Sequence, residues 1–258
     1  MNLKKLEFIK LDPAGNSTLL YNIKNLKKEE IIKVSENLKK KEYLDAEQIG
    51  FIDENHIQML GGEFCGNASR SFGVYLAKND KEFQKRKSYT ITCSGEDTPI
   101  ELEIIGSTVE NSFFSKIKMP RYISMQNINL NRIKICKVEF LGITHFIFES
   151  KGISSSVVEL IKSYCKKYKI KNFGVMFFDK EDYFMVPYVN IESIGGCWEN
   201  SCASGTAALG FYLGKDNNFD SININQPGGL LEISIENDEL YINGPINILA
   251  EGISYIDY

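Results

Sequence analysis

The chain has 258 residues, of which 43% are hydrophobic and 25% are charged, and its formal net charge is −4. This composition is typical of a folded protein with room for one large domain or two lobes. It lacks the basic stripe of a nucleic-acid-binding protein, and no apolar run approaches the roughly 18 residues that a membrane helix needs.

The opening residues, 1–12, alternate between apolar and polar types, which is typical of an edge strand and not of a secretory signal. We therefore expect a cytoplasmic protein that binds neither nucleic acid nor a membrane.

Most of the sequence has the pattern of short β-strands, which are rich in β-branched and aromatic residues and often alternate. In chain order, the predicted strands are 6–11, 18–23, 56–60, 88–93, 100–105, 114–119, 133–140, 144–149, 173–178, 183–190, 221–225, 230–236 and 240–249. Residues 28–40 and 155–168 instead carry apolar residues at helical spacing with polar residues between them. This pattern predicts two surface helices.

The segments that follow Cys65 and Cys202 begin with small residues and become apolar nearly all round. This predicts two helices buried on every side, over residues 66–80 and 203–217. The segments are also copies of each other, because the same residue types follow each cysteine at four fixed offsets. The matching pairs are Gly73 and Gly210, Tyr75 and Tyr212, Leu76 and Leu213, and Lys78 and Lys215.

One copy lies in each half of the chain, which indicates an internal duplication. We predict an α+β fold of two pseudo-symmetric lobes, each a strand-rich sheet wrapped around a central helix. The first lobe spans residues 1–118 and carries Cys65, and the second spans residues 119–249 and carries Cys202. The boundary is placed where a predicted strand ends at Met119-Pro120, and residues 250–258 are candidates to return to the first lobe.

The chain contains six cysteines, and in a reducing compartment each is expected to be a small buried hydrophobic residue. A zinc site is not expected, because the sequence has no Cys-x-x-Cys and neither His56 nor His145 lies at ligand spacing from a cysteine pair. The alternative interpretation is a pair of core cysteines that happen to repeat. The small residues directly after Cys65 and Cys202 favour a functional interpretation instead.

Small residues at a helix start leave backbone N–H groups free to bind an anion, and the helix dipole is positive there. A helix N-terminus also lowers a thiol pKa from about 8.5 towards neutrality. If the two helix starts meet, a substrate carboxylate would bind the N–H groups with its α-carbon between two sulfurs. One thiolate would remove the α-proton and the opposite thiol would protonate the other face. This chemistry requires no pyridoxal phosphate or other cofactor.

The runs 61–70 (GGEFCGNASR) and 199–208 (ENSCASGTAA) resemble the two cysteine motifs of the diaminopimelate epimerase family. That family has two lobes around central helices and works without a cofactor, and the resemblance covers nearly the whole chain. It implies catalytic roles for Cys65 and Cys202. It also implies contacts with a small amino-acid substrate for Asn16, Glu47, Gln48, Gly66, Asn67, His145, Asn172, Ala203 and Ser204.

The departures from the family pattern concern the substrate. Diaminopimelate epimerases carry Glu-Arg nine and eight residues before the second cysteine, and the Arg binds the distal carboxylate. Here these positions are Ser193 and Ile194, and the Asn of a Gly-Asn-Pro-His segment is Ile143. The chain looks most like the histidine racemases of this family, in which Glu47 could pair with an imidazole ring. An exposed charge beside a strand is an equally good explanation of Glu47.

Two other functions remain open at this point. One is diaminopimelate epimerase itself, which the missing Arg disfavours. The other is a non-catalytic binding relative or a phenazine-type isomerase of similar fold, although those isomerases lack the cysteine pair. Proline racemases differ because a His follows their Cys-Gly. A homodimer is one candidate assembly.

Overall fold

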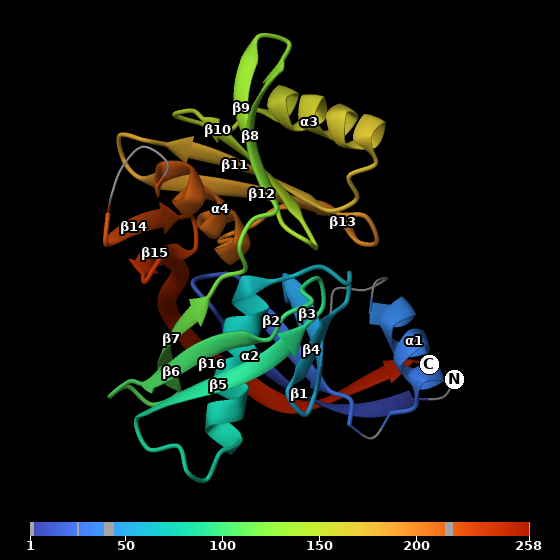
Figure 1. Ribbon diagram of the computed structural model, residues 1–258. Coiled ribbons are helices and arrows are strands. Elements are labelled where there is room, and N and C mark those ends of the chain that lie inside the picture. The colour runs from blue at the N-terminus through green and yellow to red at the C-terminus, as the bar shows by residue number, and fades with distance from the viewer. Residues whose placement is uncertain (1–2, 25, 39–43, 215–218, 258) are drawn as a thin grey trace.

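The structure is a computed structural model that describes residues 3–24, 26–38, 44–214 and 219–257 (Figure 1). Within these residues it has four helices, which are α1 (Lys28–Leu38), α2 (Gly66–Asn79), α3 (Ser155–Tyr168) and α4 (Ala203–Gly214). The strands of the first half are β1 (Leu3–Asp12), β2 (Thr18–Asn22), β3 (Gln48–Asp53), β4 (His56–Met59), β5 (Arg86–Cys93), β6 (Ile100–Gly106) and β7 (Ser112–Lys118). Those of the second half are β8 (Ser124–Leu130), β9 (Ile133–Glu139), β10 (Thr144–Glu149), β11 (Phe173–Asp179), β12 (Phe184–Ile191), β13 (Gly195–Trp198), β14 (Ser221–Gln226), β15 (Gly229–Glu236) and β16 (Glu239–Asp257).

Strands β1 to β7 follow one another in the sheet, and β16 closes them into a ring because it pairs with both β7 and β1. Helix α2 packs inside this ring against β5, β6 and β7 (Figure 1). Its middle lies very close to the strands, since a Cβ on Gly73 would lie 2.2 Å from Leu102 Cδ1. The all-round apolar pattern of this helix therefore reflects burial on every side.

The second half continues the same sheet in the order β16, β15, β14, β12, β11, β10, β9 and β8, with β13 paired to β12. Helix α4 packs against β10, β11, β15 and β16. Gly210 repeats the close approach of Gly73, because a Cβ there would lie 2.7 Å from Leu240 Cδ1. Helix α3 instead covers the outer face of this sheet and buries one apolar stripe on it (Figure 1).

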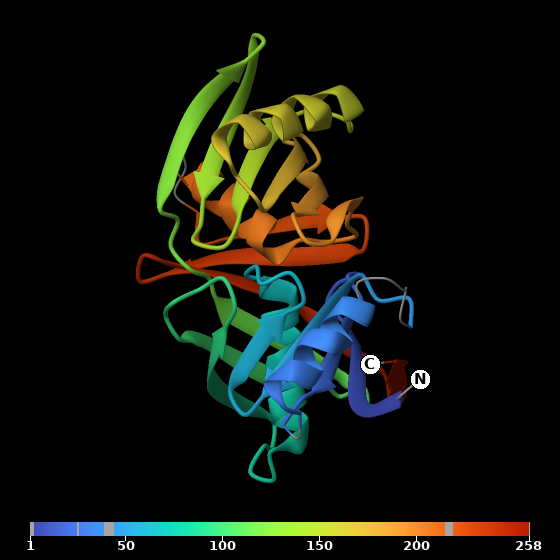
Figure 2. The ribbon, with the colours of Figure 1, turned by 90° about the vertical axis from the view of Figure 1, so that its right-hand side faces the viewer.

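The long strand β16 connects the two halves (Figure 2). Its residues 239–243 pair with β15, residues 241–247 pair with β7, and residues 247–257 pair with β1. The predicted strand over residues 240–249 is therefore the start of a longer element. Its last part lies in the ring that surrounds α2.

The predicted α+β class is confirmed as a strand-rich fold with few helices. The predicted helix over residues 155–168 agrees with α3, and the predicted helix starts after Cys65 and Cys202 agree with α2 and α4. Residues 39–40 of the first predicted helix and Lys215 of the repeat lie outside the described residues. No helix in the described ranges is long and apolar enough to cross a membrane.

Candidate active site

The two helix starts meet in the centre of the molecule. Cys65 caps the N-terminus of α2, and its sulfur accepts a hydrogen bond from Ala68 N at 3.3 Å. Cys202 repeats this arrangement before α4, where its sulfur accepts from Gly205 N at 3.4 Å. A Cβ added to Gly66 would lie only 2.9 Å from the Cβ of Ala203. The duplicated sequence therefore builds two matching helix N-termini that face each other.

Both cysteines line one cavity of about 400 Å³. Of the residues implied by the resemblance, six more line it with them, which are Glu47, Gln48, Gly66, Asn67, Ala203 and Ser204. Its apolar wall includes Met59, Leu60, Ile143, Val189 and Ile191. The sequence prediction thus brings both sulfurs and most of the candidate binding residues to one place.

Asn16, His145 and Asn172 do not line this cavity, although the resemblance implied that they contact the substrate. Asn16 is fully buried and donates its side-chain N–H to Ser201 O at 2.6 Å. Asn67 donates to the same oxygen at 3.1 Å. These two amides hold the residue that precedes Cys202, so Asn16 supports the site from behind.

His145 also acts from behind the cavity wall. It is fully buried, and its Nε2 lies 2.9 Å from Ser204 Oγ, which in turn lies 3.5 Å from Cys202 Sγ. Burial lowers the pKa of His145 to about 3, so the ring is neutral at physiological pH. Asn172 links two loops, because it donates to Gly142 O and accepts from Glu192 N.

Glu47 and Gln48 lie side by side at different depths. Glu47 is exposed at the rim, where its carboxylate accepts hydrogen bonds from Asn200. Gln48 is half-buried and reaches Cys65, since its Oε1 accepts from Cys65 Sγ at 2.8 Å. Its Nε2 donates to Glu199 Oε1 at 3.4 Å. Gln48 is thus the residue of this pair that contacts a candidate catalytic group.

Sequence reasoning missed two buried acids in the cavity, Glu63 and Glu199. They stand two residues before Cys65 and three residues before Cys202, so their sequence signal was an acid upstream of each cysteine. Among the described residues that line the cavity there is no Lys or Arg. Away from the helix starts, the cavity wall therefore carries acid groups and no basic side chain among its described residues, an environment that favours cations or neutral hydrogen-bond donors over anions.

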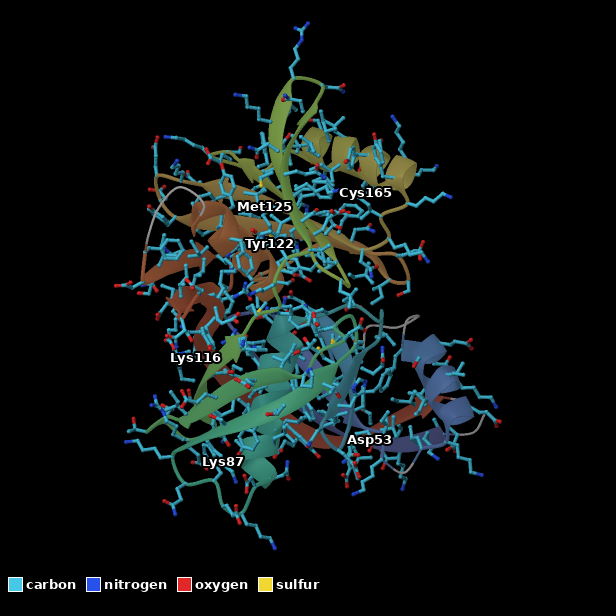
Figure 3. The ribbon with its side chains drawn as sticks, viewed as in Figure 1. Asp53, Lys87, Lys116, Tyr122, Met125 and Cys165 are labelled. Atoms are coloured by element: carbon cyan, nitrogen blue, oxygen red, sulfur yellow. The ribbon has the colours of Figure 1, made fainter. Side chains whose placement is uncertain are left out.

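The four other cysteines have different environments. Cys93, Cys136 and Cys165 are buried in the apolar core, which agrees with the expectation for an ordinary cysteine. Cys165 lies on α3, in the half of the molecule farther from α2 (Figure 3). Cys197 on β13 is exposed and lines the outer cavity wall. The described residues contain no group of three His, Cys, Asp or Glu side chains that could hold a metal.

The expectation of lowered thiol pKa values is wrong for the cavity as it stands. Burial raises the pKa of Cys65 and that of Cys202 well above the usual range. The hydrogen bonds from Ala68 N and Gly205 N act in the opposite direction but do not compensate. The reason is that the free-energy cost of desolvating a thiolate exceeds the stabilisation that one backbone N–H and a helix N-terminus give to it.

Comparison of the sequence with known proteins assigns the chain to a family. The family model described as "Histidine racemase CntK N-terminal domain" matches residues 5–255. A histidine racemase of Fusobacterium nucleatum subsp. nucleatum is 48% identical over 256 residues, which are 97% of each chain. A histidine racemase of Staphylococcus aureus is 25% identical over the full length of both chains.

Solved structures show the same fold at low identity. A predicted epimerase from Pseudomonas aeruginosa superposes with a TM-score of 0.69 at 11% identity, covering 96% of this chain and 98% of that one. A hydroxyproline epimerase from Agrobacterium vitis gives a TM-score of 0.68 at 10% identity, with 100% and 93% covered. The match of the family model over residues 5–255 and the 48% identity to a relative of equal length show that this chain belongs to the histidine racemase CntK family.

Proposed function

We propose that this protein is a histidine racemase that uses Cys65 and Cys202 as its two proton-transfer groups and needs no cofactor. The observation that carries the proposal is the meeting of two cysteine-capped helix N-termini in one cavity. One thiolate takes the α-proton of the bound amino acid, and the opposite thiol gives its proton to the other face of the planar carbanion. Each turnover moves one proton onto one sulfur and one proton off the other, so the reaction is balanced.

The helix starts supply the binding site for the substrate carboxylate. The first N–H groups of a helix have no partner within the helix, and here those of Gly66, Asn67, Ala203 and Ser204 lie at the two ends that meet. Negative charge builds up on the carboxylate as the α-proton leaves, and these fixed N–H donors stabilise it. This donor set explains why both motifs begin with small residues.

The raised thiol pKa values are compatible with this chemistry once substrate is bound. An amino acid brings an ammonium group into the cavity, and a nearby cation favours the ionised form of a thiol. Thiolate formation then accompanies substrate binding, and the empty cavity keeps both sulfurs protonated. Unwanted alkylation of the resting thiols is correspondingly slow.

Histidine fits the cavity better than a diacid does. The acids Glu47, Glu63 and Glu199 can accept hydrogen bonds from an imidazole or balance an imidazolium charge. A second substrate carboxylate would meet these acids with no cation in reach among the described lining residues. Ser193 and Ile194, at the positions of the diaminopimelate clamp, are exposed and offer no Arg. The relatives' names agree with this choice of substrate.

The decisive experiment follows α-proton exchange and chirality with purified protein. In D₂O, L-histidine should gain deuterium at the α-carbon and lose optical activity without added pyridoxal phosphate. A panel that includes LL-diaminopimelate, L-proline and L-lysine tests specificity. A far higher kcat/KM for LL-diaminopimelate would overturn the assignment in favour of the epimerase, and binding of amino acids without exchange would favour a non-catalytic relative.

We further propose the two-lobe division, with residues 1–118 and 250–258 in one lobe and residues 119–249 in the other. The closed ring around α2 and the different set of strands that packs on α4 support it, although both halves belong to one continuous sheet and β16 crosses the boundary. The wider kinship with diaminopimelate epimerases rests on the paired cysteine motifs. A homodimer and a cytoplasmic location remain predictions.

A further inference from the structure

Arg70 is a buried positive charge behind the start of α2. Its side chain is fully buried and is one of the largest such side chains among the described residues. Its Nη1 donates to Asn67 Oδ1 at 3.3 Å, and its Nη2 donates to Pro245 O at 3.4 Å. Side chains on a helix lean towards the helix N-terminus. The guanidinium therefore reaches back beside the first turn, which follows directly on Cys65.

No carboxylate neutralises this charge in the part of the chain that the structure describes. None of the ion pairs found there includes Arg70, and its Nε has no hydrogen-bond partner. Burial lowers the pKa of Arg70 to about 9, and the negative charge of an ionised Cys65 acts in the opposite direction, so the guanidinium is charged at pH 7. A buried charge without a counter-charge is costly, and this cost falls when a negative charge forms nearby.

Hydrogen bonds hold the guanidinium at the junction of the two helix starts. Asn67, whose Oδ1 accepts from Arg70, lines the cavity and donates its Nδ2 to Ser201 O at 3.1 Å and to Ser201 Oγ at 3.2 Å. Ser201 is the residue directly before Cys202. Strand β16 closes the other side, since a Cβ on Gly244 would lie 2.8 Å from Arg70 Nη2. The charge therefore has a fixed place behind the cavity wall.

The positive charge belongs to one side of the duplicated motif. Arg70 stands five residues after Cys65, whereas the residue five after Cys202 is Ala207. The ring behind the Cys202 side is that of His145, which is neutral at this pH. The two halves thus share the cysteine and the helix start, but only the first has a cation behind them.

We propose that Arg70 is a positioning residue for racemisation, whose fixed positive charge stabilises the Cys65 thiolate from behind the start of α2. Burial raises the pKa of Cys65, and a positive charge behind the helix start acts against this shift because it favours the ionised sulfur. Arg70 does not line the cavity and transfers no proton itself. The inference rests on the proposed role of Cys65 as a proton-transfer group.

The test is the rate at which iodoacetamide alkylates each active-site cysteine at pH 8, resolved by mass spectrometry of the Cys65 and Cys202 peptides. Below the pKa of a thiol, this rate is proportional to the fraction of thiolate. Arg70→Met removes the charge and should slow the alkylation of Cys65 by about tenfold, the effect of one pKa unit, with a smaller change at Cys202. Arg70→Lys keeps the charge and should restore most of the wild-type rate.

A merely structural role of Arg70 predicts the opposite sign. If its loss only loosened the helix starts, both cysteines would become more exposed and both would be alkylated faster. Arg70→Gln is a second neutral variant, because its amide still carries N–H donors but no charge, and it should slow Cys65 as Arg70→Met does. The acid and thiol groups that face Cys65 are Glu63, Glu199 and Cys202, and they are the same in every variant.

Lys137→Met is the matched control for the loss of a buried positive charge. Lys137 is 7% exposed, pairs with Glu139 on β9 and does not line the cavity, so both alkylation rates should stay at the wild-type value. Unchanged or faster alkylation of Cys65 in the neutral variants of Arg70 would overturn the inference, as would the same slowing in Lys137→Met. Circular dichroism establishes that each variant is folded.

Racemisation assays separate this inference from the proposed function. Arg70→Met should lower kcat/KM for histidine by about tenfold, and Arg70→Lys should recover most of it. A wild type that does not racemise histidine would contradict the proposed function, while the alkylation rates would still report on Arg70. Racemisation by the wild type, combined with unchanged alkylation of Cys65 in Arg70→Met, would overturn the role of Arg70 alone.

Discussion

Gly66 is the first residue of α2 and lies directly against Ala203, the first residue of α4. The contact is so close that a Cβ on Gly66 would lie 2.9 Å from the Cβ of Ala203 and 3.3 Å from Met119 Cε. One of the two helix starts must therefore be a glycine, and the other has room for a single methyl group. This contact sets the separation of the two halves at the cavity that Cys65 and Cys202 line.

A methyl group at position 66 should separate the helix starts. We expect Gly66→Ala to lower the free energy of unfolding by about 1–3 kcal/mol. It should also reduce kcat/KM for histidine by roughly tenfold to a hundredfold, because displacement of reacting groups by about an ångström is costly. Denaturant unfolding and steady-state racemisation measure the two effects. The double variant Gly66→Ala with Ala203→Gly moves the methyl group to the other helix and should recover most of the activity. Failure of this rescue would show that the contact does not set the geometry.

Cys65→Ser and Cys202→Ser should each reduce racemisation by about 10³-fold while the protein stays folded. A serine hydroxyl is too weak a base at neutral pH to replace a thiolate, and a positioned acid or base contributes about 10²–10⁴-fold. Each variant removes one of the two proton-transfer groups, so each should lose nearly all of its racemase activity. Cys136→Ser, which changes a cysteine of the core away from the cavity, is the control for general effects of cysteine loss. Wild-type turnover by either active-site variant would contradict the two-base mechanism.

The sequence predicted the centre of the site better than its surroundings. Cys65 and Cys202 carry the duplication, and a local pattern of small residues followed by an apolar helix identifies them. Glu199 is different, because an acid three residues before a cysteine has no periodicity, and only the fold shows that it is buried. Asn16 and His145 were assigned to the substrate by resemblance, but they lie behind the cavity, where they bond to Ser201 and Ser204.

The strands show the same dependence on context. Most of the predicted strands were found, because alternation along a half-buried strand is visible in the sequence. Strands β3, β8 and β13 were missed. β8 is a polar strand at the end of the sheet and β13 is an exposed four-residue partner of β12, so neither buries enough apolar surface to leave a pattern. β3 is almost continuously buried and contains Gly50, which removes the alternation.

Oxidation should inactivate the enzyme by joining Cys65 to Cys202. The two sulfurs line one cavity from helix starts that touch, so a small closure can bring them to bonding distance. Diamide should abolish racemisation and dithiothreitol should restore it, and peptide mapping should find the Cys65–Cys202 linkage. Cys197 is the exposed cysteine at the same cavity. Cys197→Ser should be inactivated like the wild type, and protection by this substitution would show that the linkage forms elsewhere.

The buried His145 should make the fold sensitive to acid. The unfolded chain binds a proton at this ring below the usual pKa of 6.5, whereas burial lowers the pKa in the fold to about 3. Stability from the neutral ring is therefore complete above pH 6.5 and is lost as the pH falls towards 3. The gap between the two pKa values corresponds to at most about 5 kcal/mol. In His145→Gln this loss should be absent.

The wild-type curve alone does not isolate this effect, because Glu199 acts in the opposite sense. With its pKa raised to about 8, Glu199 retains in the fold a proton that the unfolded chain releases, which favours the fold as the pH falls from 8 towards 4.5. The two contributions oppose each other between pH 6.5 and 4.5.

The Glu199 contribution is the same in wild type and His145→Gln, so it cancels in the difference between their unfolding free energies. This difference should shrink by about 2 kcal/mol from pH 6.5 to pH 5. His56 is the other histidine of the chain, and because it is partly exposed, His56→Gln is the control for the loss of a histidine outside the core. A difference that is independent of pH would show that His145 titrates in the fold as it does in the unfolded chain.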